Sequence, residues 1–117
     1  MTFDEFAKEI DMDVTGTLNR FSGNAELMQH FVRTFPDDKT FPQLQAAIAA
    51  GNWSGIEEAA HTLKGVSGNL GFSTLFTLTS EIVNDVRTKQ FDAATALFPK
   101  AIECCQHIID CINKLDG

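Results

Sequence analysis

Residues 59–71, AAHTLKGVSGNLG, combine one histidine with a lysine three positions later and with three glycines. A neutral imidazole nitrogen is a nucleophile that can attack phosphorus and hold a phosphoryl group covalently. Imidazole titrates close to neutral pH, so much of it is available in that neutral form. Lys64 follows His61 by about one helical turn and can place an ammonium beside the phosphoryl oxygens. The pair therefore predicts a histidine that accepts a phosphoryl group.

Two glycines of this stretch are expected on the same side of the helix as the histidine. At 100° per residue, Gly65 and Gly68 share one side with His61 and Lys64. Each glycine inside a helix lowers its stability by roughly 1 kcal/mol relative to alanine. Glycines beside the histidine therefore indicate a role other than stability. We expect Gly65 and Gly68 to clear the approach of another protein, and Gly71 to end the helix.

The chain shows no other machinery for phosphoryl chemistry. It has neither a P-loop nor a kinase-type glycine-rich loop for a nucleotide. No carboxylate cluster indicates a dedicated Mg²⁺ site, and no Ser/His/Asp set is recognisable, although a spatial triad stays open. We expect no metal of its own and no kinase activity, so the donor and the metal must come from a partner.

The other histidines and the three cysteines are predicted to have no part in catalysis or metal binding. His30 has no acidic or metal-ligand partner at the required spacing, and His107 follows the Cys pair on a helix that already has a packing explanation, so we take both as incidental residues. Cys104, Cys105 and Cys111 contain no C-x-x-C pair and are odd in number, which argues against zinc and against a disulfide framework. They are expected to be free, buried or half-buried thiols on a helix.

Composition limits the class of protein. The 117 residues are 44% hydrophobic and 21% charged, which is typical of one compact domain over residues 1–117. A formal net charge of −7 argues against nucleic-acid binding, and no apolar run approaches the ~20 residues that span a bilayer. The N-terminal stretch MTFDEFAKEI does not resemble a signal peptide, so we expect a cytoplasmic protein.

Helical periodicity runs through nearly every segment. We expect short helices within residues 1–22 and a helical bundle over 24–117, with elements near 3–10, 13–21, 25–35, 41–50, 54–70, 73–88 and from 92 onward. The expected N-caps are Thr2 and Ser54, each completing a capping box with the glutamate three residues later, and also Asn24, Ser73 and Asp92. Helix ends are expected at Pro36, Gly51 and Gly71. Short connections make the long helices antiparallel neighbours, which predicts an all-α, up-down-up-down four-helix bundle.

Three stripes of small and apolar residues are expected to face the core. They comprise Ile56, Ala60, Leu63, Ser67 and Leu70; Leu75, Leu78, Ile82 and Val86; and Leu97, Ala101, Cys104, Ile108, Cys111 and Leu115. Pro99 should kink the last helix or end its first part. Phe72 and Leu75 are either further core residues or apolar surface beside the bare patch. Glu57 is expected to be a first-turn charge that answers the helix dipole.

HTLKGVSGNLG (61–71) closely resembles the signature of histidine-containing phosphotransfer (HPt) domains, a His-x-x-Lys-Gly core with a glycine ten residues after the histidine. GNAELMQHFVRTF (23–35) looks like the family's helix upstream of the active helix, and the resemblance covers essentially the whole chain. It implies a four-helix bundle whose exposed histidine takes phosphate from an aspartyl phosphate on a receiver domain and passes it to another receiver.

By motif position, the resemblance makes His61 the phosphoacceptor, Lys64 an electrostatic aid to the phosphate and Gly65 the clearance for a partner. Some relatives carry a polar side chain on the next helix that hydrogen-bonds the imidazole. The equivalent stretch here, EIVNDVR (81–87), offers Asn84, which has a suitable side chain, or Val83, which has not. Arg87 stands where some relatives have a second basic residue, or it is a solvated residue near a helix C-terminus.

The partners that the resemblance implies are response-regulator receiver domains and a hybrid sensor histidine kinase. Mg²⁺ is expected to come from the receiver, and the protein is expected to be a monomer. We expect a freestanding protein, since the chain begins with Met and ends soon after its last helix. A docking module that transfers nothing, and the substrate domain of a chemotaxis-type histidine kinase, stay open as alternatives. A metal-binding bundle enzyme is the least favoured. Transient transfer complexes predict a modest interface.

Overall fold

The computed structural model describes all 117 residues as an all-helical chain with one isolated bridge, between Met12 and Phe72. The elements are α1 (Phe3–Glu9), α2 (Val14–Arg20), α3 (Ala25–Thr34), the 3₁₀ turn η1 (Phe35–Asp37), α4 (Thr40–Ala50), α5 (Trp53–Leu70), α6 (Ser73–Arg87) and α7 (Phe91–Ile112). The predicted all-α fold class is confirmed. No helix combines the length and the apolar character needed to cross a membrane.

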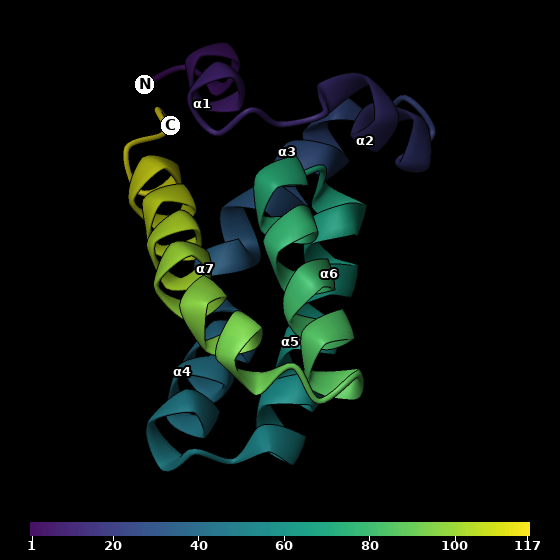
Figure 1. Ribbon diagram of the computed structural model, residues 1–117. Coiled ribbons are helices and arrows are strands. Elements are labelled where there is room, and N and C mark those ends of the chain that lie inside the picture. Colours follow the sequence, from purple (N-terminus) through teal and green to yellow (C-terminus); the bar gives the residue numbers. More distant parts are fainter.

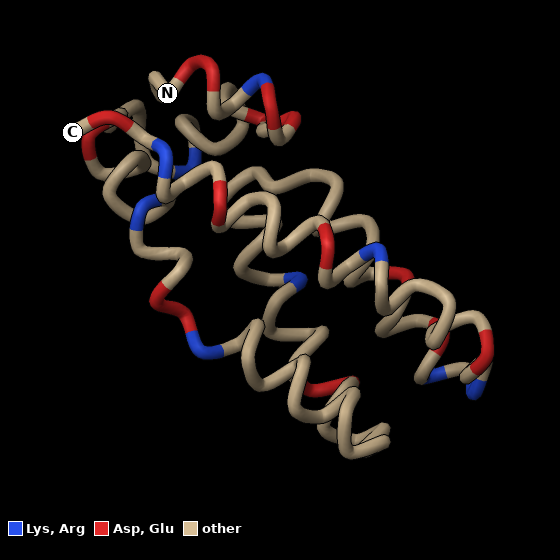
Figure 2. The backbone as a smooth tube through the Cα atoms, turned by 90° about the vertical axis from the view of Figure 1, so that its left-hand side faces the viewer, with Lys and Arg blue, Asp and Glu red and all other residues tan.

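The helices form a bundle around the pair α5 and α6 (Figure 1). One side is built from α3, η1 and α4 in succession, and α5, α6 and α7 follow as antiparallel neighbours (Figure 1). The short helices α1 and α2 close one end, where the two chain termini also lie (Figures 1 and 2). There the Met1 ammonium is 3.0 Å from Asp116 Oδ1. Along the backbone, Lys and Arg residues are scattered among Asp and Glu residues and do not form one block (Figure 2).

Local sequence explains several helix boundaries. Thr2 and Glu5 form the expected capping box, with Thr2 N donating to Glu5 Oε1 at 2.9 Å and Glu5 N to Thr2 Oγ1 at 3.2 Å. The Asn24 side chain accepts from Leu27 N at 3.1 Å and begins α3. Gly51 ends α4 with φ of 64°, in the left-handed region that favours glycine. The hydrogen bond from the Thr2 backbone N–H, followed by the effect of the Thr2 side chain, holds the pKa of the Glu5 carboxyl below its ordinary value.

Three predicted N-caps are wrong. The N-cap of α5 lies two residues earlier than expected, because the Asn52 side chain accepts from Gly55 N at 3.0 Å, and Ser54 lies inside the helix. α6 begins at Ser73 itself after Phe72, which has no capping oxygen. α7 follows Gln90 and has no side-chain cap, so Asp92 contributes only as a first-turn charge.

The α5 boundary gives a test of this correction. Replacing Asn52 with Ala should lower the free energy of unfolding by about 1 kcal/mol, because the Gly55 N–H loses its acceptor. Replacing Ser54 with Ala is the matched control and should change it by less than about 0.5 kcal/mol. Urea titrations followed by circular dichroism measure both. A larger loss for the Ser54 variant would restore Ser54 as the cap.

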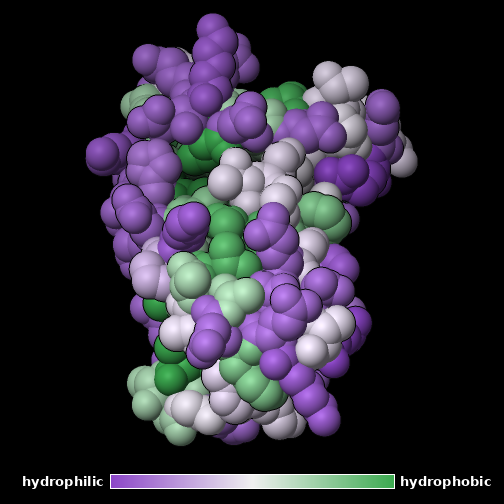
Figure 3. Space-filling view, viewed as in Figure 1, coloured by the Kyte–Doolittle hydropathy of each residue, from purple (hydrophilic) through white to green (hydrophobic).

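The core is one cluster of 26 buried apolar residues that runs from Phe6 in α1 to Ile112 in α7. The α5 stripe is buried as predicted. In α7 the predicted stripe is partly wrong, since Leu97, Cys104 and Leu115 are only half-buried. The buried positions of α7 are Ala94, Phe98, Ala101, Cys105, Ile108, Cys111 and Ile112. Hydrophobic surface remains visible as a green column between α6 and α7 (Figure 3).

Two features in the middle of α7 differ from the sequence-based predictions. The helix runs unbroken through Pro99, so the expectation that it ends there is wrong. Cys105 takes the core position that was assigned to its neighbour Cys104, and burial raises the pKa of the Cys105 thiol to about 12. All three cysteines are free, as predicted.

Candidate functional site

His61 lies in the middle of α5, on the side opposite the stripe that packs into the core. Its neighbours at Ala60 and Leu63 are 0% and 1% exposed, whereas the imidazole itself is exposed. Because the buried stripe fixes the rotation of α5, the ring is held outward by packing on the far side of the helix. The ring makes no hydrogen bond or ion pair within the chain, unlike His107, which lies 3.8 Å from Glu9. The one nitrogen of a neutral imidazole that carries a free lone pair can meet an electrophile in this exposed setting.

Lys64 is half-buried on the side of α5 that faces α6. Its Nζ lies 5.9 Å from the centroid of the Phe76 ring, within the range of a cation–π contact. No carboxylate pairs with this ammonium, since the three ion pairs of the chain involve other residues. The charge therefore stays available one turn from His61, on a flexible stem that can swing toward an anion.

The three glycines of the stretch have three different surroundings. A Cβ placed at Gly65 would have no heavy atom within 4 Å, so this surface is open. A Cβ at Gly68 would lie 3.1 Å from Phe76 Cδ2, so the missing side chain of Gly68 makes room for that ring. Gly71 ends the helix with φ of 74°, and a Cβ there would collide with Thr17 and Asp13. Of the two glycines predicted to clear a partner's approach, only Gly65 faces open space.

Arg87, the last residue of α6, donates from Nε to Glu57 Oε1 at 2.7 Å. This ion pair lies one turn before His61 on α5, so it flanks the histidine on the side opposite Lys64. Since α5 begins at Trp53, Glu57 lies beyond the first turn, and its predicted role as a helix-dipole charge is wrong. The structure instead makes Glu57 the partner of Arg87.

The two candidate imidazole partners on α6 have different surroundings. Val83 is 2% exposed and belongs to the core, so it does not face the site. Asn84 is exposed, and its backbone carbonyl accepts from Thr88 Oγ1 at 2.8 Å. Its side chain makes no hydrogen bond, and the structure forms none between Asn84 and His61. A role for Asn84 as imidazole partner stays a prediction.

The apolar surface beside the site comes from Phe76, and not from the predicted candidates Phe72 and Leu75. Phe72 and Leu75 are 1% and 0% exposed, which makes them core and excludes them from docking. Phe76, the next residue along α6, is 39% exposed and lies over Gly68. Its signal was present in the sequence, because position 76 falls outside the inward spacing of Leu75, Leu78 and Ile82.

The other titratable groups do not gather into a second centre. His30 is exposed and lies edge-on to Phe31, with ring centroids 5.6 Å apart. The ring of His107 is 3.7 Å from Cys111 Sγ. Glu58 and His61 stand in the Glu-x-x-His spacing of some metal-binding bundles, but nowhere do three or more potential ligands lie together.

The candidate site is thus an exposed histidine on a packed helix of an all-helical chain, with the Lys64 ammonium, which no carboxylate pairs, one turn away. The sequence model of the Hpt domain family matches residues 26–116, and the chain therefore belongs to that family. Hpt domains are histidine-containing phosphocarrier modules of two-component signalling that work with receiver domains and histidine kinases, and they are not themselves kinases. No curated protein and no solved structure matches the chain. The family match begins after α2, so α1 and α2 lie outside it.

Proposed function

We propose that this chain is a phosphocarrier of a multistep His–Asp relay. His61 takes the phosphoryl group from an aspartyl phosphate of one receiver domain and gives it to the aspartate of another. The observation that carries the proposal is the exposed imidazole without any partner inside the chain, next to a Gly65 position that is open to solvent. Together they admit a receiver's active site to the ring.

The chemistry needs little from the chain itself. A neutral imidazole nitrogen of His61 attacks phosphorus, the N–P bond forms, and the P–O bond to the receiver's aspartate breaks, its electron pair leaving with the carboxylate. Lys64 supplies positive charge near the transferred oxygens, and Arg87 is a second candidate for that role. Mg²⁺ belongs to the receiver in this proposal. Transfer to the second receiver is the same step in reverse.

A receiver panel tests the proposal. Purified chain is mixed with Mg²⁺ and each of several phosphorylated receiver domains, and the labelled protein is examined for stability. We expect an acid-labile, base-stable phosphoprotein, as a phosphohistidine requires. A docking module that transfers nothing would bind receivers without taking label. Absence of label with every receiver of the source organism would overturn the proposal.

Glu57 should oppose the phosphorylated state. Its carboxylate lies one turn from His61 and holds Arg87, whereas a phosphoryl group brings about two negative charges to the same face. Glu57→Gln removes the repulsion and releases Arg87 toward the phosphate. We expect the equilibrium level of phosphohistidine with a labelled receiver to rise about twofold to fivefold. This change corresponds to the interaction free energy of a solvent-exposed charge pair.

The control for this variant is Glu103→Gln, which removes one exposed carboxylate from α7 and leaves the ion pair intact. It should leave the phosphohistidine level unchanged. Phosphoprotein bands quantified at equilibrium measure both variants. A fall in the level for Glu57→Gln would mean that Glu57 supports Arg87 in binding phosphate, contrary to the expectation.

A further inference from the structure

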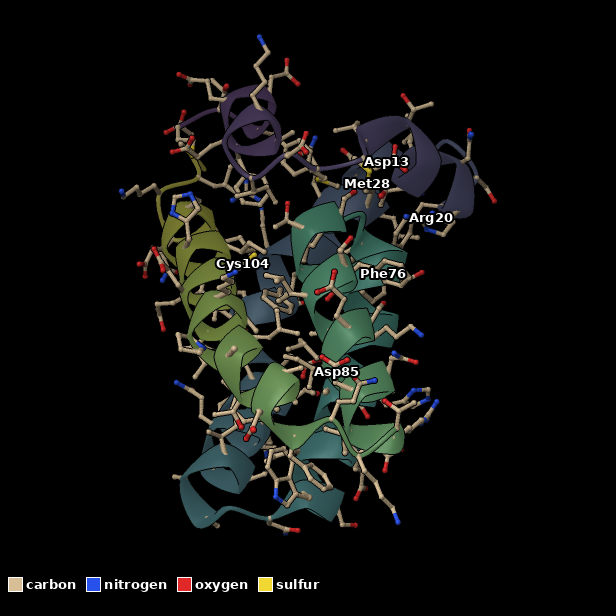
Figure 4. The ribbon with its side chains drawn as sticks, viewed as in Figure 1. Asp13, Arg20, Met28, Phe76, Asp85 and Cys104 are labelled. Carbon is tan, nitrogen blue, oxygen red and sulfur yellow. The ribbon has the colours of Figure 1, made fainter.

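A hollow of about 330 Å³ lies between α2 and the first turns of α6, beside the C-terminal half of α5. Arg20 and Phe76 form part of its lining, together with Gly68 and Thr77. Figure 4 shows Arg20 and Phe76 near each other on the right-hand side of the molecule, with Asp13 above them. No role in the proposed phosphotransfer step uses this hollow.

Arg20 is held in place by neutral partners. Its Nε donates to the Asn69 carbonyl of α5 at 3.1 Å, and its Nη2 donates to Thr17 Oγ1 at 3.0 Å. Asp13 lines the same hollow, but its carboxylate accepts from Gly16 N at the start of α2 and forms no ion pair with Arg20. The guanidinium is therefore positioned yet unbalanced in charge, and Nη1 is free to donate to an incoming carboxylate.

Phe76 gives the hollow an apolar wall. The ring is 39% exposed, although most large apolar side chains of the chain are buried. Gly68 allows the ring to lie against α5, and the Lys64 ammonium stands 5.9 Å from its centroid. An exposed aromatic side chain thus lies between two cations without carboxylate partners, in a protein whose net charge is −7. This local surface complements an acidic partner that also presents an apolar side chain.

The hollow lies within reach of any protein that docks at His61. Asn69, which anchors Arg20, follows His61 by eight residues, or about 12 Å along α5. A standard interface covers about 800 Å² on each partner, so a receiver centred on His61 covers the hollow as well. Arg20 lies before residues 26–116, which the Hpt family model matches, so this contact involves a residue outside the matched part.

We propose that the Arg20–Phe76 hollow is a specificity site of the receiver-docking surface, which binds a carboxylate side chain and an adjacent apolar side chain of the cognate receiver. The inference rests on the proposed phosphocarrier function. Because Arg20 is anchored at Asn69, about 12 Å along α5 from His61, we assign it to docking and not to the transferred phosphoryl group. Charged residues at the edge of an interface mainly change association and the choice of partner.

Charge reversal of Arg20 tests the inference. Transfer rates are measured against concentration for the receiver that labels the unchanged chain fastest, with Arg20→Glu and with Lys100→Glu. Lys100 is exposed on α7, so both variants shift the net charge by the same two units. We expect KM for the receiver to rise about tenfold or more with Arg20→Glu, with the maximal transfer rate unchanged, and to change less than twofold with Lys100→Glu.

Two further variants separate docking from folding. Thr77→Trp fills the hollow from an exposed position of α6 without touching the Arg20 hydrogen bonds, and it should raise KM in the same way. Arg20→Lys keeps the positive charge, so its KM for the receiver should lie between those of the unchanged chain and Arg20→Glu. Equal KM values for Arg20→Glu and Lys100→Glu, or normal transfer with Thr77→Trp, would overturn the inference. A failure of the unchanged chain to take label from any receiver would instead overturn the phosphocarrier function.

Discussion

Replacing His61 with Gln is expected to abolish phosphoryl transfer to the chain completely. Gln matches the histidine in polarity and approximate size, and the position is exposed, so the bundle should fold with unchanged stability. What the variant loses is the ring nitrogen that attacks phosphorus. The measurement is radiolabel on the chain after incubation with a phosphorylated receiver, which should drop to the background of the receiver alone.

The chain contains its own controls for this result. His30 and His107 are the other two histidines, and both are also exposed. His30→Gln and His107→Gln should take label at the rate of the unchanged chain. Label that persists in His61→Gln and disappears in one of the other two variants would move the phosphoacceptor to that residue.

Replacing Gly65 with Gln should separate stability from function. The surroundings of Gly65 leave a Cβ unobstructed, and Gln is a better helix former than Gly, so the free energy of unfolding should rise by about 0.5–1 kcal/mol. The longer side chain would nevertheless stand on the surface beside His61, where a receiver must approach. We expect the transfer rate to fall at least about tenfold, since close approach of reacting atoms dominates such a step.

A graded series sharpens this prediction. Gly65→Ala adds one methyl group and should gain similar stability with a much smaller loss of transfer. Thermal unfolding and transfer kinetics on the same samples compare the two effects. A Gly65→Gln variant that is more stable and still transfers at the normal rate would defeat the steric explanation of this glycine.

The helical framework was predictable because its signals are local. The α5 stripe from Ile56 to Leu70 follows the 3.6-residue period, and burial of that stripe determines that His61 points outward. The same pattern located Gly65 beside the histidine. Asn24 and Gly51 act through contacts within one turn of the chain, which is why these boundaries were also found.

Features that depend on packing between helices were not predictable in the same way. Glu57 and Arg87 are 30 residues apart and meet only because α5 and α6 run antiparallel. Gly68 shares a helix side with His61, yet Phe76 of α6 occupies the space above it. At α7, Cys104 and Cys105 are chemically identical neighbours, so only the rotation of the folded helix decides which one is buried.

A two-step transfer tests most directly whether the chain carries a phosphoryl group from one receiver to another. The chain is labelled on His61 by one receiver, purified away from that donor, and mixed with a second, unphosphorylated receiver and Mg²⁺. We expect label to leave the chain and to appear on the aspartate of the second receiver, much faster than it is lost as free phosphate. Label that stays on His61 with every receiver, or that leaves only as free phosphate, would show that the chain is not a carrier between receivers.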